Sequence, residues 1–541
     1  MRRLALLIAG FALAAGADRI CAAGGPEPGA IERTIPGQHR DEIAPTQVRV
    51  PAHQVTVSAA KNSPFTLGAV NIDGATIFSQ EQLSRYFEPY LATQVDQQKL
   101  SSIADAITAR YRETGYLLSY AAVPAQQVDA GMVRLAVVEG RIDKISIVGG
   151  GSAEAALEAI AAPLLSGAPL KGQTLERTLG LIRDFPGLSV TDIALMRSDS
   201  EGEHYTLKIS MVPHRLRGFS YADNRGVAGL GRTRVYNSVS MSSLLMKGDE
   251  FKLDLFAMPG GHSRYLYGQF LGSVPIGNNG LRLSISGSRG NQYLRSDEKF
   301  DGRSDNLSAL LSYPIRRSRA LTIIGKGSLT DWRSTGRQGD VRRLRDHLRV
   351  ARLGLQFVNE GSTRFDGEVM VSRGLGFGGI TRVGDPLASR PDASGRFTKV
   401  ALSAQVSRPL SARVTVRAVA LAQYSDRPLL SAEEFSLGGN HVGRAYDFNA
   451  ATGDRGAAAG LELGYRLGKN GQSATELFGF VDDGIARDIK SAVSPGSTRK
   501  LASTGAGARF SLLGTTVAVE AAVPLSAGKR ARLFVSVFRS F

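Results

Sequence analysis

The stretch "EFKLDLFAM" at 250–258 is typical of a strand that crosses a membrane. Its large apolar residues Phe251, Leu253 and Leu255 stand at every second position. Because a strand points successive side chains to opposite faces, one face of this stretch is apolar throughout. A tilted strand of about 9 to 11 residues spans a bilayer, and only its lipid face has to be apolar. The pattern therefore predicts a transmembrane β-strand.

The same alternation continues to the end of the chain. It recurs in "LRLSISGS" at 281–288, "ARVTVRAVALA" at 412–422 and "ARLFVSVFRSF" at 531–541. From Arg217 onward the chain divides into sixteen candidate strands, an even number that suits an outer-membrane barrel. We therefore predict a membrane β-barrel of about 16 antiparallel strands over 215–541.

The connections between these strands are expected to alternate in length. Short polar turns are predicted at Lys247, Pro275, Arg316, Gly361, Arg408 and Lys469. Long loops are predicted at 291–304, 374–396, 425–456 and 485–500. Outer-membrane barrels have short periplasmic turns and longer external loops. This order therefore predicts a closed barrel that the chain enters from the periplasm.

Composition and charge limit the class of protein. The 541 residues carry a formal net charge of +17, and the segment from Arg217 onward holds all of that excess. We assign it to arginines that face water and anionic lipid head groups, and "RRLRDHLR" from Arg342 fits an external loop of this kind. A basic protein can also bind nucleic acid, but a secreted barrel does not meet any.

The N-terminal region is predicted to direct secretion. Arg2 and Arg3 precede the apolar run 4–15, and small residues follow, so 1–23 has the features of a signal peptide. The polar, proline-containing segment 24–64 is expected to be a linker or a short plug helix. The single cysteine, Cys21, lies in the predicted signal peptide, so no disulfide is expected in the mature protein.

Two similar α+β units are predicted between this region and the barrel. In 65–141 a strand leads to a capping box formed by Ser79 and Gln82, which begins a first helix. A second helix carries Leu100, Ile103, Ile107 and Tyr111 on one face, and two strands follow. The order β-α-α-β-β recurs in 142–214, where "DFPG" at 184–187 ends the second helix.

Two segments of the barrel carry the most specific pattern. The loop after the eleventh strand contains "FSLGGNHVGRAYDFNAATGDRG" at 435–456, and the thirteenth strand reads "ELFGFVDDGIA" at 476–486. Together they resemble the TpsB-type transporters of two-partner secretion, the haemolysin secretion and activation family. In that superfamily a loop with a V-R-G-Y/F motif folds into the barrel against an F-x-D motif on its wall. The residues carried over to this sequence are Val442, Gly443, Arg444, Tyr446, Asp447, Phe480, Asp482 and Gly484.

The resemblance implies that Arg444 meets Asp482 inside the barrel and holds the loop there. A guanidinium and a carboxylate in a partly dry lumen can form a bidentate, charge-assisted bond. Ala445 departs from the family pattern, which usually has glycine at this position. The alternative interpretation is that Arg444 is an ordinary lumen charge and Asp482 an ordinary inward-facing wall residue.

The resemblance also covers the two α+β units, which look like POTRA domains of this family. It implies an outer-membrane transporter that exports one large, β-helical exoprotein of the TpsA type, such as a haemagglutinin, adhesin or haemolysin. The POTRA domains are expected to bind the unfolded secretion domain of this partner in the periplasm, and the lumen loop is expected to gate the pore. We also expect a monomer without cofactor, surrounded by lipid including lipopolysaccharide and inserted by the barrel assembly machinery.

Two other functions stay open on the residues alone. The barrel motifs are shared with assembly factors that insert other outer-membrane proteins, and a passive porin has a similar barrel. An enzyme is not expected, because the chain has no G-x-S-x-G, H-E-x-x-H or Walker motif. Asp482 and Asp483 are adjacent on a strand and point to opposite faces, so they do not form a carboxylate dyad. The seven histidines have no ligand spacing, so no metal site is expected.

Overall fold

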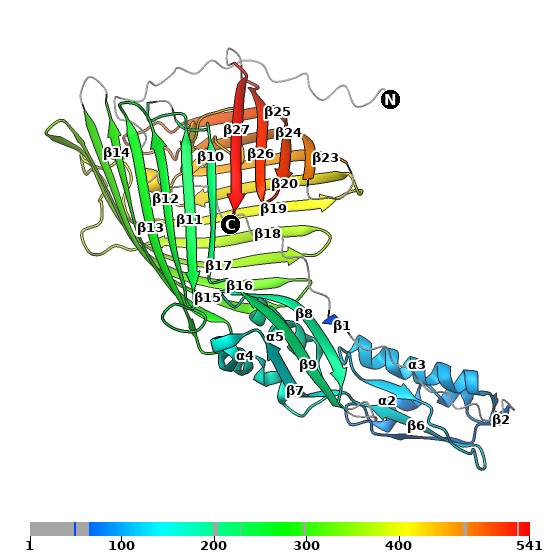
Figure 1. Ribbon diagram of the computed structural model, residues 1–541. Coiled ribbons are helices and arrows are strands. Elements are labelled where there is room, and N and C mark those ends of the chain that lie inside the picture. Colours follow the sequence, from blue (N-terminus) through cyan, green and yellow to red (C-terminus); the bar gives the residue numbers. More distant parts are fainter. Residues whose placement is uncertain are drawn as a thin grey trace, which may run out of the picture.

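The C-terminal part of the protein is a closed antiparallel barrel (Figure 1). The computed structural model describes residues 48–49, 64–198, 204–227, 229–295, 299–468, 473–526 and 530–541. The barrel strands are β10 (Leu216–Asp223), β11 (Arg234–Ser242), β12 (Glu250–Pro259), β13 (Arg264–Ile276), β14 (Leu281–Leu294), β15 (Phe300–Arg317), β16 (Thr322–Gln338), β17 (Val341–Glu360), β18 (Arg364–Gly374), β19 (Thr398–Pro409), β20 (Val414–Ser425), β23 (Arg455–Leu467), β24 (Ser473–Arg487), β25 (Thr498–Leu512), β26 (Thr515–Pro524) and β27 (Arg532–Ser540). The sixteen-stranded fold class predicted from the sequence is thus confirmed.

Closure brings the first and last strands together. β10 and β27 pair antiparallel, from Phe219 opposite Ser540 to Asp223 opposite Ser536. Gly218 and Phe541 exchange two backbone hydrogen bonds of 2.9 Å. The C-terminal phenylalanine therefore completes the ladder, and no strand edge is left open to lipid.

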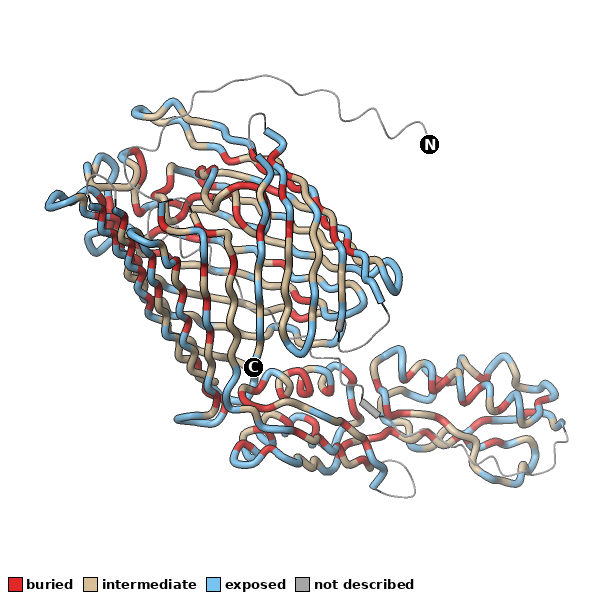
Figure 2. The backbone as a smooth tube through the Cα atoms, turned by 45° about the horizontal axis from the view of Figure 1, so that its top comes forward, coloured by how far each residue is buried: buried red, intermediate tan, exposed pale blue. Residues whose placement is uncertain are grey.

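The wall alternates as the sequence predicts. Buried and exposed segments follow one another along the barrel strands (Figure 2). On β12, Leu253 and Leu255 are exposed on the outer face, whereas Asp254 and Phe256 are buried on the inner face. The outer face offers apolar side chains to lipid, and the inner face carries most of the polar groups.

The longest connections lie at one end of the barrel. Turns at the end that faces the α+β units span 243–249, 277–280, 318–321, 361–363, 410–413 and 513–514. Long loops at the other end span 375–397, 426–454 and 488–497. Three of the four predicted long loops are confirmed. The predicted alternation in length is wrong at two places, because the connections 260–263 and 339–340 at the same end are short.

Two predictions about the external side are wrong. The expected loop 291–304 is mostly strand, because β14 and β15 stay paired up to Leu294 opposite Phe300. The segment from Arg342 lies in β17 and not in a loop. Here the sheet extends beyond the length that a bilayer requires. The loop 375–397 stabilises the extension, since the backbone N–H of Arg345 donates to Leu387 and that of Thr381 donates to His347.

The first α+β unit has the predicted elements with one added strand pair. Its elements are β2 (Phe65–Thr66), β3 (Ala69–Asp73), α2 (Gln80–Ser84), η1 (Glu88–Tyr90), β4 (Gln94–Val95), α3 (Gln97–Glu113), β5 (Tyr120–Ala122) and β6 (Met132–Val138). The capping box of Ser79 and Gln82 is present. Leu100, Ile103 and Ile107 of α3 are buried against the sheet.

The second unit repeats this plan and receives a strand from the N-terminal region. It consists of β7 (Arg141–Val148), η2 (Gly151–Ala153), α4 (Glu154–Ala161), η3 (Ala162–Leu165), α5 (Gly172–Arg183), β8 (Leu188–Arg197) and β9 (His204–Pro213). β1 (Val48–Arg49) pairs parallel with β8 and covers that edge of the sheet. The predicted signal peptide 1–23 and the rest of the segment 24–64, apart from Pro64, lie outside the described residues.

The second unit is docked directly on the periplasmic turns of the barrel. Arg317 of β15 forms two hydrogen bonds with Asp184, of 2.8 and 3.0 Å. Arg177 of α5 donates to the carbonyls of Pro314 (2.8 Å) and Asn279 (3.1 Å). No helix in the described part of the chain is long and apolar enough to cross a membrane.

Candidate functional site

The loop between β20 and β23 folds back into the barrel. Its flanks form the short hairpin of β21 (Phe435–Leu437) and β22 (Ala451–Gly453), in which Ser436 lies opposite Thr452. Gly438 and Gly439 turn the chain with φ of 105° and 99°, values that favour glycine. The tip of the loop packs on the inner faces of β24 and β25, where Val442, Ala445 and Tyr446 share one buried cluster with Phe480. The inward-folded loop predicted from the motif is therefore present.

Asp482 holds the backbone of this tip. Its carboxylate accepts from the N–H of Gly443 at 2.7 Å and from the hydroxyl of Ser503 at 2.6 Å. The N–H of Arg444 lies 3.4 Å from the second oxygen. Asp482 is 2% exposed, whereas Asp483 is exposed on the outer face. Asp482 thus acts as a cap for the loop tip.

The guanidinium of Arg444 does not bind Asp482, so that prediction is wrong. It donates to Glu462 of β23 at 2.8 Å, with Glu520 of β26 at 3.6 Å. Its central carbon lies 4.2 Å from the centre of the Phe480 ring, a cation–π arrangement. The two motifs do meet, but through the arginine backbone and the aromatic ring. The ion pair is made with a neighbouring strand.

Glu462 is the centre of a charged network on the wall. Arg509 of β25 donates to both of its oxygens, at 2.7 and 2.9 Å. Arg417 joins from β20 at 3.1 Å and also binds Glu476 of β24 at 2.7 and 2.8 Å. Because three arginines surround Glu462, this carboxylate stays compensated inside the lumen. Charged side chains of four strands, β20, β23, β24 and β25, therefore form the surface on which the loop tip rests, which we call its seat.

Other arginines hold the carbonyl and carboxylate groups of the tip. Arg225 donates to the carbonyl of Arg444 at 2.9 Å and to Glu520 at 2.6 Å. Asp447 binds Arg232 at 2.8 Å and Arg532 at 2.7 Å. These contacts come from the first and last strands and their adjoining loops, so the tip bridges the seam of the barrel.

Aromatic rings and glycines shape the wall beneath the loop. Phe480 lies opposite Gly505 in the register of β24 and β25, and Phe478 lies opposite Gly507. A Cβ at Gly505 would lie 2.6 Å from the Phe480 ring. Gly484 serves the loop itself, because a Cβ there would lie 2.7 Å from Leu437 of β21. The glycines thus allow the ring of Phe480 and the hairpin to approach the wall closely.

The remaining motif residues are placed as follows. Val442 is buried, and the hydroxyl of Tyr446 donates to the carbonyl of Ala502 at 3.2 Å. Gly443 has a φ of +75°, whereas Ala445 is absent from the positive-φ residues. The alanine therefore fits where the family usually has glycine, because its backbone takes an ordinary conformation and its methyl group is buried.

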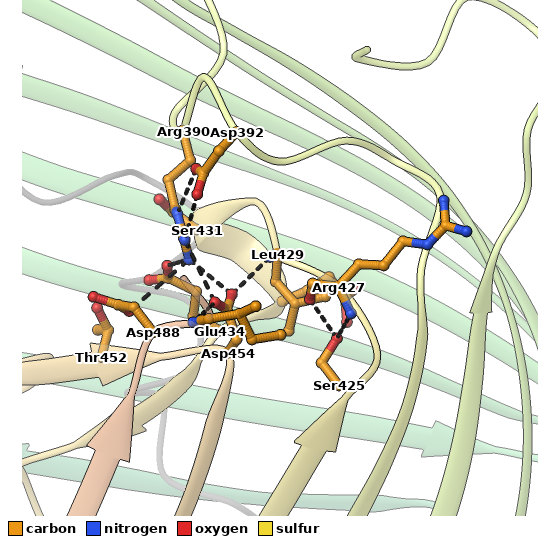
Figure 3. Close-up of polar contacts among 12 residues, drawn as sticks. Arg390, Asp392, Ser425, Arg427, Leu429, Ser431, Glu434, Thr452, Asp454 and Asp488 are labelled. Atoms are coloured by element: carbon orange, nitrogen blue, oxygen red, sulfur yellow. Dashed lines mark hydrogen bonds and ion pairs between the residues drawn. The ribbon is translucent and has the colours of Figure 1, made fainter. Parts of the chain in front are cut away.

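A second charged centre joins the external loops (Figure 3). Arg390 of the loop 375–397 donates to Glu434 and Asp454, both at 2.7 Å. It also binds Asp392 at 3.2 Å and lies 3.9 Å from Asp488. Burial raises the pKa of the Glu434 carboxyl, although the charge of Arg390 opposes this shift. One arginine thus links three loops above the lumen.

Asp454 extends this centre through the backbone. It accepts from the N–H groups of Leu429 and Ile489, both at 2.7 Å. Leu429 belongs to a buried cluster with Trp332 and Phe397. Polar and apolar contacts therefore hold the external loops together as one cover.

Sequence reasoning missed Glu462, Glu520, Ser503, Arg509 and Arg390. A carboxylate on the lumen face of "GLELGYRL" could have drawn attention to Glu462, because an inward acid needs a basic partner. Which basic residue reaches it depends on the register of four strands. For Arg390, no sequence pattern points to its partners.

Comparison with known proteins agrees with this geometry. The model of the haemolysin secretion/activation protein family ShlB/FhaC/HecB matches residues 207–510, and the model of the ShlB-type POTRA domain matches 65–140. The chain belongs to the haemolysin secretion/activation protein family. It is a transporter of two-partner secretion in the outer membrane, with its POTRA domains in the periplasm.

Curated relatives and solved structures of this family resemble the transporter over most of its length. It is 24% identical over 465 residues to the Heme/hemopexin transporter protein HuxB of Haemophilus influenzae, covering 82% of this chain and 80% of the relative. It is 23% identical over 445 residues to the outer membrane transporter CdiB of Dickeya dadantii, covering 79% and 77%. The structure of CdiB from Escherichia coli has the same fold, with a TM-score of 0.73, 20% identity and 95% of both chains covered.

Proposed function

We propose that the transporter exports one large β-helical exoprotein of the TpsA type and that the loop 426–454 closes the pore at rest. The seating of Arg444 on Glu462 and Phe480 carries this proposal. A loop that only lined a permanent channel would not need a buried ion pair and a capped backbone at its tip. Relatives with a similar chain are named for haem/hemopexin transport and as CdiB transporters, so the cargo class of this protein is a secreted protein.

The gate has an inner and an outer closure in this proposal. The inner closure is the tip of the loop, held by Asp482 and Glu462. The outer closure is the set of external loops joined by Arg390. Both involve the segment 426–454, since Glu434 directly precedes β21 and Asp454 directly follows β22. A displacement of this one segment would therefore loosen both closures together.

Cargo capture is assigned to the POTRA domains. An unfolded secretion domain can add a strand to an exposed sheet edge, which tolerates many sequences because the main chain pairs. In the second domain β1 covers the edge at β8. In the sheet β3-β6-β5 of the first domain no described strand covers the edges at β3 and β5, so we assign docking to this sheet.

The oligomeric state, lipid contacts and insertion of the barrel are part of the same proposal. We infer a monomer, because the barrel closes on itself and has its own gate. Its outer face would contact membrane lipid including lipopolysaccharide, and the barrel assembly machinery would insert it. The protein would act without catalysis, and folding of the cargo outside the cell would supply the direction of transport.

A reversible crosslink tests the gate. Leu437→Cys and Gly484→Cys place two thiols where the hairpin touches the wall, and the first change removes the side chain that a Cβ at Gly484 would meet at 2.7 Å. Since the single native cysteine is Cys21 in the predicted signal peptide, the pair is free of competing thiols. Oxidation should block export of the candidate exoprotein and reduction should restore it.

The controls separate gating from damage. Each single-cysteine variant should export normally under oxidising conditions. Single-channel recordings in planar bilayers give a second measurement without any cargo: the oxidised pair should lose the flickering openings of the reduced protein. Continued export by a fully crosslinked protein would overturn the gating role, and steady open conductance would favour a porin.

A further inference from the structure

The first periplasmic turn of the barrel presents three consecutive large apolar side chains. Leu244, Leu245 and Met246 are 62%, 80% and 50% exposed. Single exposed apolar residues are common on protein surfaces, but a cluster of them marks an interaction site. In the other periplasmic turns, as far as the structure describes them, no three such residues are consecutive: Leu410 is alone, and Leu513 follows the exposed Leu512 at the end of β25.

The turn 243–249 has a fixed backbone. Asp249 is fully buried, and its carboxylate accepts from the N–H groups of Leu244 (2.8 Å), Leu245 (2.7 Å) and Met246 (2.8 Å). Ser243 takes a φ of +55°, which is unfavourable for a residue with a side chain. A charged acceptor that binds three donors fixes this conformation strongly. The three apolar side chains are therefore held in their exposed position.

The two sides of the turn face different surroundings. On its inner side lies the second POTRA domain, since a Cβ at Gly248 would lie 3.1 Å from the ring of Phe185. On its outer side the turn continues the lipid face of the barrel. Leu216 and Met241 pair across β10 and β11 directly before the turn, and both are exposed. Only Ser242 and Ser243 separate this exposed apolar pair of the wall from the three apolar residues of the turn.

We propose that the turn 243–249 is a lipid anchor that inserts Leu244, Leu245 and Met246 into the periplasmic leaflet of the outer membrane. Apolar side chains at this level bury in the region between head groups and acyl chains. Lys247 lies beside them, and its long stem allows its ammonium to reach a lipid phosphate. Because the second POTRA domain packs on the same turn, the anchor also holds that domain close beneath the bilayer.

Tryptophan fluorescence in the full-length protein tests this anchor. Trp332→Phe removes the only tryptophan, and Leu245→Trp then places a single probe in the turn. The protein is reconstituted in vesicles of phosphatidylethanolamine and phosphatidylglycerol with brominated acyl chains. Bromine near the head groups should quench the Leu245→Trp probe strongly, and its emission should shift to shorter wavelength.

Two control probes give the response expected inside the bilayer and in water. Leu255→Trp lies on the lipid face of β12 and should be quenched most by bromine deep in the bilayer. Met132→Trp lies on an exposed position of the first POTRA domain and should respond only to acrylamide in the water. If the Leu245→Trp probe behaves like the Met132→Trp probe, the anchor does not exist. A response of the Leu245→Trp probe to a purified secretion domain, without any response to bromolipid, would assign the turn to protein docking and also overturn the proposal.

The support given by Asp249 has its own test. Asp249→Asn in the Leu245→Trp background should weaken quenching by bromolipid, because the amide accepts fewer of the three N–H bonds. Resistance of the folded barrel to unfolding in detergent shows whether the variant is intact. Unchanged quenching in a folded Asp249→Asn variant would overturn the role of Asp249 in presenting the three side chains.

Discussion

Arg444 and Asp482 have separate tasks at the tip of the gating loop. Asp482→Ala removes the acceptor of the Gly443 N–H and the Ser503 hydroxyl. The free energy that holds the loop tip on the wall should fall by about 1 to 3 kcal/mol. Arg444→Ala removes the ion pair with Glu462 but leaves that carboxylate with Arg509 and Arg417. Export should fall sharply in both variants, while insertion of the barrel stays near normal.

The matched control for Asp482→Ala is Asp483→Ala. Asp483 is the next residue on β24 and is exposed on the opposite face. It should leave export and single-channel conductance unchanged. Arg444→Lys keeps the charge but loses the planar stacking on Phe480, so it should restore part of the function. Full export by both alanine variants would remove this contact from the gate.

Glu139 gives the first POTRA domain a stability that depends on pH. Burial raises the pKa of its carboxyl, but hydrogen bonds outweigh burial and lower the pKa below its usual value. They come from the Thr76 side chain and N–H, the Ile77 N–H at 3.0 Å and the Tyr111 hydroxyl at 2.7 Å. A lowered pKa means that this stabilisation is complete above the unfolded-state pKa and is lost as pH falls through the folded-state pKa.

Glu139→Gln tests this dependence. The variant should destabilise the domain by about 1 to 3 kcal/mol at neutral pH and should lose much of the acid sensitivity. Amide hydrogen exchange at Thr76 and Ile77 in the intact protein measures both effects. Equal acid sensitivity of the variant and the original protein would contradict the assignment to Glu139.

At the scale of elements, Arg390 joins three external loops. Arg390→Ala leaves Glu434, Asp454 and Asp392 close together without their common cation, which should cost about 3 to 5 kcal/mol. Limited proteolysis of intact cells should then cut the loops faster, and channel recordings should contain longer openings. Arg396→Ala in the same loop should change neither, because the only hydrogen bond described for its side chain goes to the carbonyl of Gly376.

Most elements could be predicted from the sequence, because strand alternation and loop length are local properties. The β-strand containing Phe480 and Asp482 follows directly from alternation, and so do the inward and outward faces. The partner of Arg444 could not be predicted in the same way. Gly460 lies opposite Asp482 and Glu462 lies opposite Phe480, so the pairing depends on the register between strands. The extension of β17 was missed because a polar strand that another loop covers has the composition of a loop.

At the scale of the whole molecule, the second POTRA domain and the barrel form a continuous unit (Figure 1). Gly180 of α5 allows the close approach, since a Cβ there would lie 2.5 Å from the Arg317 side chain. Arg317 in turn holds Asp184 at the end of the same helix. This docking holds the second POTRA domain at a constant position below the barrel.

Loosening this contact should therefore reduce export without opening the gate. Gly180→Leu or Arg317→Ala should broaden the distance between spin labels placed on α4 and on the turn 361–363, measured by pulsed electron resonance. Arg319→Ala is the control, because the hydrogen bond described between Arg319 and the POTRA domain comes from its backbone N–H, which donates to Glu176. Single-channel conductance should stay unchanged in all three variants, since the seat of Arg444 is intact. A broadened distance with unimpaired export would mean that capture tolerates a mobile domain, and the fixed position would then have no role in transport.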